Sequence, residues 1–525
     1  MILHSRLKIS ALLVILALAR CAAAQSGLPA DLDAYVARDM KAFDVPGIAI
    51  AIVKDGKVVL AKGYGVKKLG EAAPVDENTL FGIGSNTKAF TSAALASLVD
   101  AGKISWDDKV YERLKGFEMY DPYVSHEMTI RDLLTHRSGM GLGEGDLLFW
   151  PRTTFTRDEI IYRLRFMKPA SSFRSRFAYD NLMYIAAGQI IPAVTGKSWE
   201  EYIHEKILQP LGMKTSNLST NAFKPGDNYA LPHSRVDGKL QVVPFMDLDN
   251  AAPAGAINSS VAEMSKWVML QLNHGKIPGS DQRIFSEAQS REMWTGQTLL
   301  PISGSDSPLA ALRPKFAAYA LGWGVADYHG RKLVGHSGGV SGFVTRVMLV
   351  PEENLGVLVF TNAEAGAAFE SILYHILDSY FGVAPTDWTA VMKTARDEQE
   401  KEAKEMMAAN EKGRAANSKP LLPLEKYAGI YNDAWYGPIT IKQEGSGLVF
   451  RMEHTPKAVA DLQHWQYDTF KAHWRDRTIE DAFVTFTLNP DGSIDHFTMA
   501  AVSPLADFSF DYQDLWFKPE PAQTH

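Results

Sequence analysis

A serine and a lysine three residues apart are the part of this sequence best suited to covalent chemistry. Ser85 and Lys88 precede a small, apolar run, residues 89–102, that predicts a buried helix. Residues three apart share a helix face, so the Ser85 hydroxyl would lie beside the Lys88 amine. Burial lowers the pKa of a lysine and makes it a proton acceptor, and amides at the helix start favour negative charge there. The spacing alone is weak evidence, because Ser5 and Lys8 repeat it.

Two further stretches could supply the proton relay and the oxyanion hole that a serine hydrolase needs. Tyr179 is followed by Asn181 and an apolar helix; the phenol could carry a proton and the amide could hold a substrate carbonyl. His336, Gly338 and Gly339 lead into a strand, whose glycine-rich edge could admit a substrate backbone. Taken separately, a buried tyrosine with a satisfied hydroxyl and a glycine-rich strand entry are the simpler explanations.

Together these motifs resemble the penicillin-recognising serine hydrolases. That family comprises class C β-lactamases, D-alanyl-D-alanine carboxypeptidases, D-aminopeptidases and related esterases. Residues 129–139, 210–213 and 253–260 are similar to the family as well, and the likeness spans residues 30–382. It implies an α+β fold, in which a β-lactamase/transpeptidase-like antiparallel sheet is combined with a helical domain.

The resemblance also implies a role for each motif residue. Ser85 would be the acylated nucleophile, and Lys88 and Tyr179 would share the general acid and base work. The substrate-binding residues would be Asn181, His336 and Gly338. The oxyanion hole would be the backbone amides of Ser85 and Gly339. No cofactor and no metal is expected, because the sequence has no His-Glu-x-x-His motif or comparable cluster.

The third motif departs from the Lys-Thr-Gly of β-lactamases and carboxypeptidases. This chain has His336-Ser337-Gly338 in its place. A lysine holds the carboxylate of a penicillin or of a C-terminal D-alanine, whereas a histidine with an ordinary pKa near 6.5 is mostly neutral above neutrality. His-x-Gly occurs in D-aminopeptidases and in peptidase or esterase relatives, so those classes are favoured.

Three hypotheses follow for the whole protein. The favoured one is an exported serine hydrolase that cleaves amide, peptide or ester bonds, including those of D-residue-containing or non-ribosomal peptides. The alternative is a β-lactamase or D-alanyl-D-alanine carboxypeptidase. A non-catalytic binding or sensor protein is disfavoured because Ser85, Lys88 and Tyr179 are all present. We expect a small peptide, amide or ester substrate; no basic tract suggests nucleic acid, and oligomeric state stays open.

The elements that must position these residues can be predicted from pattern. Residues 32–43 read as an amphipathic helix, and an Asp-Gly turn at 55–56 joins two β-rich runs in a hairpin. A second hairpin covers residues 343–361, with a helix at 367–381. We expect the two hairpins to form one antiparallel sheet covered by terminal helices, with a mostly helical stretch, residues 85–272, between them.

The ends of the chain differ in character from its middle. Residues 1–24 have the charged, apolar and small-residue order of a cleavable signal peptide, which predicts a periplasmic or secreted protein with no integral membrane span in the mature chain. A lipoprotein signal at the single cysteine, Cys21, is disfavoured by Arg20. The composition, 46% hydrophobic and 22% charged, is that of an ordinary globular protein.

Three segments follow the signal. We expect the hydrolase domain at residues 25–385, a charged linker at 386–420, and a small all-β barrel at 421–525 that resembles a lipocalin-like module. Short strands separated by turns predict the barrel. Its tryptophans could form a ligand face or pack its core, and core packing is the commoner use; they include Trp435, Trp465 and Trp474.

Overall fold

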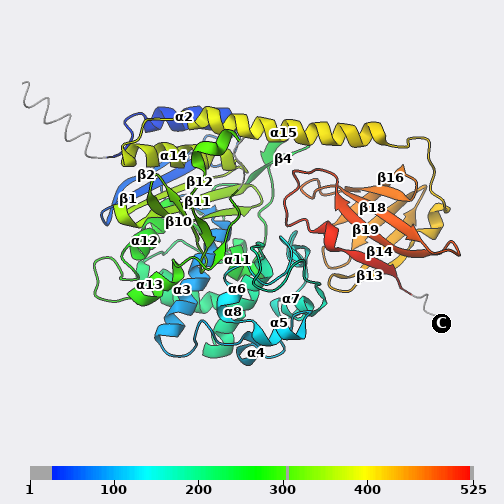
Figure 1. The fold of residues 1–525 in the computed structure, drawn as a ribbon. Coiled ribbons are helices and arrows are strands. Elements are labelled where there is room, and N and C mark those ends of the chain that lie inside the picture. Colours follow the sequence, from blue (N-terminus) through cyan, green and yellow to red (C-terminus); the bar gives the residue numbers. More distant parts are fainter. Residues whose placement is uncertain (1–26, 303–306, 521–525) are drawn as a thin grey trace, which may run out of the picture.

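The computed structural model describes residues 27–302 and 307–520. The predicted signal peptide lies outside the described residues. A mixed domain and a C-terminal barrel lie side by side, and a long helix, α15 (Trp388–Gly413), runs from the first towards the second (Figure 1). Among the described helices, none combines the length and the apolar character needed to cross a membrane.

The mixed domain is built on one eight-stranded sheet of order β2-β1-β12-β11-β10-β9-β8-β7. The two predicted hairpins meet as expected, since β1 pairs antiparallel with β12 and sets Ile50 opposite Val359. In the β1–β2 turn, Asp55 and Gly56 have φ of 51° and 71°, as a tight hairpin turn requires. The strands are β1 (Gly47–Lys54), β2 (Lys57–Gly65), β7 (Thr298–Leu299), β8 (Ala317–Tyr319), β9 (Gly324–Tyr328), β10 (Arg331–Val340), β11 (Phe343–Val350) and β12 (Leu355–Thr361).

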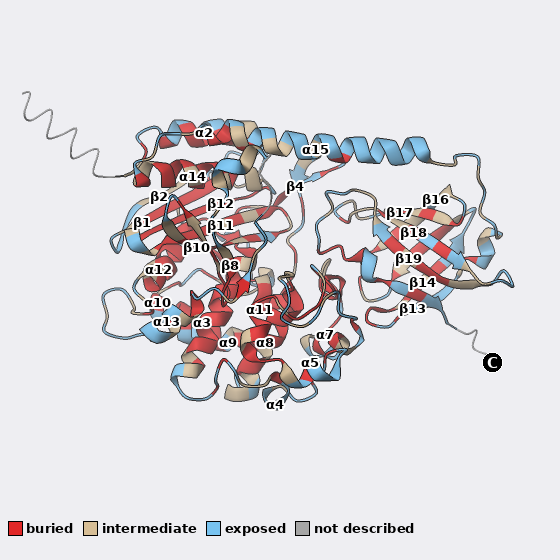
Figure 2. Ribbon diagram, viewed as in Figure 1, coloured by how far each residue is buried: buried red, intermediate tan, exposed pale blue. Residues whose placement is uncertain are grey.

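Helices cover both faces of this sheet, which explains why β1 is apolar at nearly every position (Figure 2). Alternate residues of β1 point to opposite faces. Ile48, Ile50 and Ile52 pack into a core shared with α2 (Leu32–Phe43) and α14 (Gly366–Phe381). Ala49 and Ala51 face the second core, which the inner helices fill.

In the chain, the inner helices come after strand β2 and before strand β7. Three of them carry the candidate site: α3 (Thr87–Asp100), α8 (Asn181–Thr195) and α11 (Ala252–Gly255). The others are α4 (Val110–Arg113), α5 (Pro122–Glu127), α6 (Ile130–Leu133), α7 (Arg157–Arg163), α9 (Trp199–Ile203), α10 (Gln209–Leu211), α12 (Val261–Leu272) and α13 (Glu287–Met293). Two short strand pairs complete the domain: β3 (Phe81–Gly82) with β6 (Asn258–Ser259), and β4 (His233–Val236) with β5 (Lys239–Val242).

The C-terminal strands form a closed barrel, because β13 pairs with β20 as well as with β14. Trp435 and Trp474 are buried and belong to the core; Trp465 is half-buried and packs on Phe483. The strands are β13 (Gly429–Asp433), β14 (Gly437–Glu444), β15 (Gly447–Met452), β16 (Val459–Gln466), β17 (Thr469–Trp474), β18 (Ala482–Leu488), β19 (Ile494–Ala501) and β20 (Trp516–Pro519).

The predicted linker, residues 386–420, contains α15. Most of this helix is exposed, and ion pairs four residues apart, such as Lys393 with Asp397, line its surface. The barrel also contacts the mixed domain directly: the backbone N–H of Thr154 donates to the carbonyl oxygen of His454 at 2.8 Å. The domain boundaries themselves stay predictions.

Candidate active site

The Ser85 hydroxyl and the Lys88 amine are adjacent. Ser85 lies in a 3₁₀ turn (Gly84–Asn86), and Lys88 lies in the first turn of α3, which begins two residues before the predicted helix. Lys88 Nζ is 3.0 Å from Ser85 Oγ, 2.7 Å from Asn181 Oδ1 and 3.0 Å from the carbonyl oxygen of Ala254. Lys88 is fully buried, and burial lowers its pKa to about 7.

These contacts match the hydrogen-bonding capacity of a neutral amine. A neutral lysine has two N–H groups, which can donate to Asn181 Oδ1 and to the Ala254 carbonyl. Its lone pair is then left for the Ser85 hydroxyl proton. A pKa near neutrality means that a substantial fraction of the lysine is in this form at pH 7.

Tyr179 brings a second proton-carrying group to Ser85. It directly precedes α8, whose first amides are capped by Asp180: the backbone N–H of Leu182 donates to Asp180 Oδ1 at 3.0 Å. Burial raises the pKa of Tyr179 well above its ordinary value, and a hydrogen bond with Ser85 opposes part of that rise. The Lys88 Nζ lies 4.8 Å from the centre of the Tyr179 ring. The phenol is therefore protonated at neutral pH and placed beside both Ser85 and Lys88.

The turn at residues 135–139 holds this segment in place. His136 has φ of 52°, and its Nδ1 accepts a hydrogen bond from the backbone N–H of Asp180 at 3.0 Å. The Ser138 hydroxyl donates to Asp180 Oδ2 at 3.2 Å, and the His136 ring packs on Tyr179 with centroids 4.2 Å apart. The turn therefore holds Asp180 and packs against the Tyr179 ring.

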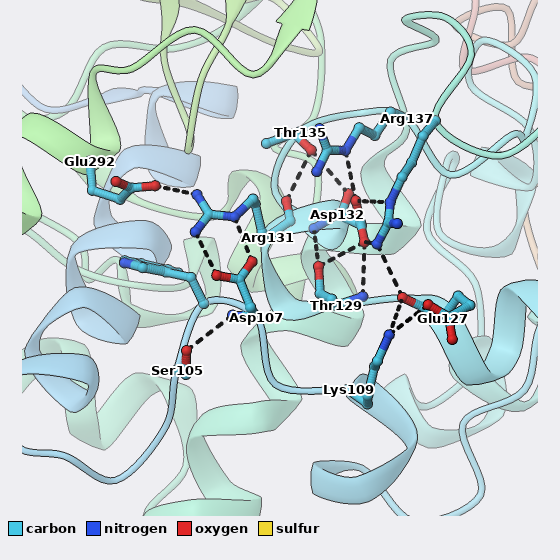
Figure 3. Close-up of polar contacts among 12 residues, drawn as sticks. Ser105, Asp107, Lys109, Glu127, Thr129, Arg131, Asp132, Thr135, Arg137 and Glu292 are labelled. Carbon is cyan, nitrogen blue, oxygen red and sulfur yellow. Dashed lines mark hydrogen bonds and ion pairs between the residues drawn. The ribbon is translucent and has the colours of Figure 1, made fainter.

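A buried carboxylate anchors that turn (Figure 3). Asp132, on α6, is fully buried and accepts from Arg137 Nε at 2.7 Å and from Arg174 Nη2 at 2.6 Å. The hydroxyl of Thr129, which caps α6, donates to Asp132 Oδ2 at 2.7 Å. Arg131, the residue before Asp132, points the other way and pairs with Asp107 and Glu292. These paired charges fix the position of α6 and of the turn that follows it.

Strand β10 presents an open edge beside Ser85. It pairs with β11 as far as Val340 but with β9 only as far as Gly335. From His336 onward, one edge of β10 has no partner strand in the described parts of the chain. A Cβ at Gly339 would meet nothing within 4 Å, so this residue faces open space.

Glycines allow β10 to approach the Ser85 turn. A Cβ at Gly338 would lie 1.9 Å from the carbonyl oxygen of Ile83. Gly84 has φ of +51°, and a Cβ there would lie 2.8 Å from the amide nitrogen of Gly339. The Gly338 of the motif is thus required by packing; its substrate-binding role stays a prediction.

His336 is held as a neutral imidazole. Its Nδ1 lies 2.5 Å from the carbonyl oxygen of Ser337 and must donate to it, so Nε2 accepts from the Tyr319 hydroxyl at 2.8 Å. Burial, and then the charge on Lys88, lower the pKa of His336 to about 3. At this position, where the Lys-Thr-Gly motif has a lysine, the present chain therefore offers no positive charge.

The segments described above border a cavity of about 290 Å³. Its lining includes Ser85, Tyr179, Asn181, His336 and Gly339. No lysine or arginine lines it among the described residues. The loop at residues 141–150 contributes Phe149 and Trp150 to the cavity wall.

The sequence did not reveal that the barrel reaches this cavity. Asp507, Phe508 and Ser509, from the segment after β19, form part of its wall. The Phe508 ring meets the Tyr179 ring edge-on, with centroids 5.8 Å apart. No motif or periodicity marks these residues. Asp146, behind Asn181, was missed for the same reason.

Comparison with known proteins gives a consistent picture. A family model described as Beta-lactamase matches residues 32–380, and one described as a domain of unknown function (DUF3471) matches residues 413–519. Unguisins hydrolase ungD' of Aspergillus campestris is 32% identical over 79% of this chain and 78% of its own length. Unguisins hydrolase ungD of Aspergillus violaceofuscus is 29% identical over 85% and 83%.

A solved structure extends the likeness to the fold. The octameric penicillin-binding protein homologue from Pyrococcus abyssi superimposes with a TM-score of 0.60 at 25% identity, covering 90% of this chain and 98% of its own. The predicted fold is confirmed: an antiparallel sheet with helices, followed by an eight-stranded barrel.

Proposed function

Because this chain belongs to the Beta-lactamase family of serine hydrolases, we propose that it cleaves amide, peptide or ester bonds through an acyl-enzyme on Ser85. One observation carries the proposal: a fully buried lysine, whose pKa is lowered to about 7, lies 3.0 Å from the Ser85 hydroxyl. Such a lysine serves as a base at neutral pH.

The chemistry proceeds in two steps. Neutral Lys88 takes the Ser85 proton as Oγ attacks the substrate carbonyl carbon, and the backbone amides of Ser85 and Gly339 stabilise the oxygen that becomes negative. The protonated Tyr179 phenol donates to the leaving amine or alcohol as the bond to it breaks. Lys88 then returns a proton to the Tyr179 phenolate. A water, deprotonated by the same pair, hydrolyses the ester on Ser85 and regenerates the free hydroxyl.

The cavity disfavours substrates that carry a carboxylate near the scissile bond. His336 is neutral, and no lysine or arginine lines the cavity among the described residues. Phe149, Trp150 and Phe508 provide apolar walls. The two relatives named as unguisins hydrolases support peptide or amide hydrolysis by this chain.

The same observation weighs against the alternative activities. A β-lactam or a D-alanyl-D-alanine peptide carries a carboxylate near the bond that is cleaved, and among the described residues no lysine or arginine lines the cavity to pair with it. We therefore rank β-lactamase and carboxypeptidase activity below amide and ester hydrolysis. Export to the periplasm or beyond, from residues 1–24, is part of the proposal and rests on the sequence pattern.

A covalent probe tests the central claim. The protein is treated with a fluorophosphonate, and intact mass and peptide mapping locate the adduct, with Ser85→Ala as control. We expect a single adduct on Ser85 and none in the variant. Turnover is then compared across aryl esters, L- and D-aminoacyl amides and nitrocefin, with esters or D-aminoacyl amides expected to exceed nitrocefin. An unlabelled Ser85 together with no turnover would defeat the proposal.

A further inference from the structure

The Asn181 side chain connects Lys88 to a buried carboxyl group. Asn181 Oδ1 accepts from Lys88 Nζ at 2.7 Å, and Asn181 Nδ2 donates to Asp146 Oδ2 at 2.8 Å. All three residues are buried, Lys88 and Asp146 completely. Because Asp146 Oδ2 is an acceptor, it holds the amide with its nitrogen towards Asp146 and its oxygen towards Lys88.

The barrel supplies a second donor to the same oxygen. The Ser509 hydroxyl donates to Asp146 Oδ2 at 2.8 Å, and Ser509 is only 5% exposed. The backbone N–H of Gly145 donates to Asp511 Oδ2 at 2.6 Å and ties the barrel segment down beside Asp146. A buried hydrogen-bond chain therefore runs from the barrel to the candidate base.

Asp146 keeps this arrangement in either protonation state. Burial raises its pKa well above the ordinary value. A proton on Oδ1, which has no partner among the described residues, would leave Oδ2 able to accept from Asn181 and Ser509. The carboxyl group thus acts through hydrogen-bond geometry.

We propose that Asp146 and Ser509 are positioning residues, which fix the Asn181 amide and through it the Lys88 lone pair. This proposal rests on the proposed function of Lys88 as base. If the amide turned over, its NH₂ group would face Lys88 and the amine would have to turn its lone pair away from Ser85. The barrel therefore helps to position the candidate base, besides forming a wall of the cavity.

Four variants separate this role from general packing. Asp146→Leu removes the acceptor at similar size, Asp146→Asn keeps an acceptor oxygen, and Ser509→Ala removes the donor from the barrel. Thr154→Val is the matched control, since Thr154 Oγ1 pairs with His454 Nδ1 at 3.0 Å across the same junction without reaching Lys88. Thermal unfolding verifies that each variant is folded.

The readout is steady-state kinetics on p-nitrophenyl acetate, a substrate too small to need the barrel wall. We expect kcat to fall about 100-fold in Asp146→Leu and about 10-fold in Ser509→Ala, with KM nearly unchanged. The apparent pKa of the basic group in the pH profile of kcat/KM should also shift in Asp146→Leu and in Ser509→Ala. Asp146→Asn should recover most of the activity, and Thr154→Val should match the wild type.

Two results would overturn the inference. One is that Ser509→Ala and Asp146→Leu keep the same kcat as Thr154→Val. The other is that these variants change KM alone, since that result means that Asp146 and Ser509 only shape the cavity wall. If Asp146→Leu does not fold, Ser509→Ala decides by the same criteria. A wild type that is neither acylated nor active refutes the proposed function instead, so the two failures are distinguishable.

Discussion

Lys88 Nζ and Asn181 Oδ1 lie 2.7 Å apart, although they come from α3 and α8, 93 residues apart in the chain. The contact takes up one N–H of the amine, and the Ala254 carbonyl takes up another. The remaining position on the nitrogen faces Ser85. The direction of the Lys88 lone pair is therefore set by two acceptors from distant parts of the chain.

The first prediction concerns the pH dependence of activity. Burial lowers the pKa of Lys88 to about 7, and the neutral amine is the active form. We expect kcat/KM to rise with pH and to level off above this value. Lys88→Arg should lose about 1,000-fold or more, because a guanidinium remains protonated. A flat profile between pH 5 and 9, or an active arginine variant, would exclude Lys88 as the base.

The second prediction concerns the proton that reaches the leaving group. Tyr179→Phe keeps the ring but removes the hydroxyl beside Ser85. We expect kcat for an amide substrate to fall by about 100- to 10,000-fold, the range for loss of a general acid. Tyr202→Phe removes another buried hydroxyl, which pairs with Ser97 Oγ at 2.8 Å, and should leave kcat within a few-fold. Equal rates in the two variants would contradict the role of Tyr179.

The third prediction concerns charge selection at His336. The neutral imidazole is paired with Tyr319 and Ser337 and gives a carboxylate no cation. His336→Lys should raise kcat/KM for a carboxylate-bearing ester, relative to its neutral methyl ester, by about 10-fold. His336→Gln, which adds no charge, should leave the ratio unchanged. The same ratio in all three proteins would show that this position does not select charge.

The fourth prediction concerns the buried carboxylate behind the turn at residues 135–139. Asp132→Ala removes the carboxylate that Arg137 and Arg174 share, and each lost charge-assisted hydrogen bond should cost about 1.5–3 kcal/mol. Asp107→Ala removes the exposed partner of Arg131 and should cost about 1 kcal/mol or less. Denaturant unfolding of the two variants measures the difference. Similar losses would mean that Asp132 does not anchor the turn.

The fifth prediction concerns the effect of pH on stability at Asp39. Asp39 is fully buried beside Thr389 on α15, and burial raises its pKa to about 6. The native state therefore binds more protons than the unfolded state between about pH 4 and 6, so stability falls as pH rises through this window. Asp39→Asn should be stabilised relative to wild type by on the order of 2 kcal/mol at pH 8. The difference in melting temperature between Asp39→Asn and the wild type should be smaller at pH 4.5 than at pH 8. An equal difference at both pH values would contradict the raised pKa of Asp39.

Local pattern was enough to predict the framework of the fold. Helix α2 (Leu32–Phe43) has the predicted bounds, and the two hairpins pair as β1 with β12. These elements are specified by periodicity and by turn chemistry at Asp55 and Gly56, which act over a few residues. Residue types and spacing supplied the candidates for the site, but it was the family resemblance that joined them, and these motif residues face one cavity.

The sequence by itself determined the reactive groups: a serine, a lysine three residues on, a tyrosine ahead of a helix, and a histidine two residues before a glycine. Only the tertiary structure decided how they are tuned. Burial of Lys88 and His336, and the approach of Ser509 to Asp146, depend on segments up to 363 residues apart in the chain. A pKa and a hydrogen-bond direction are properties of surroundings, and distant parts of the chain create those surroundings only when it folds.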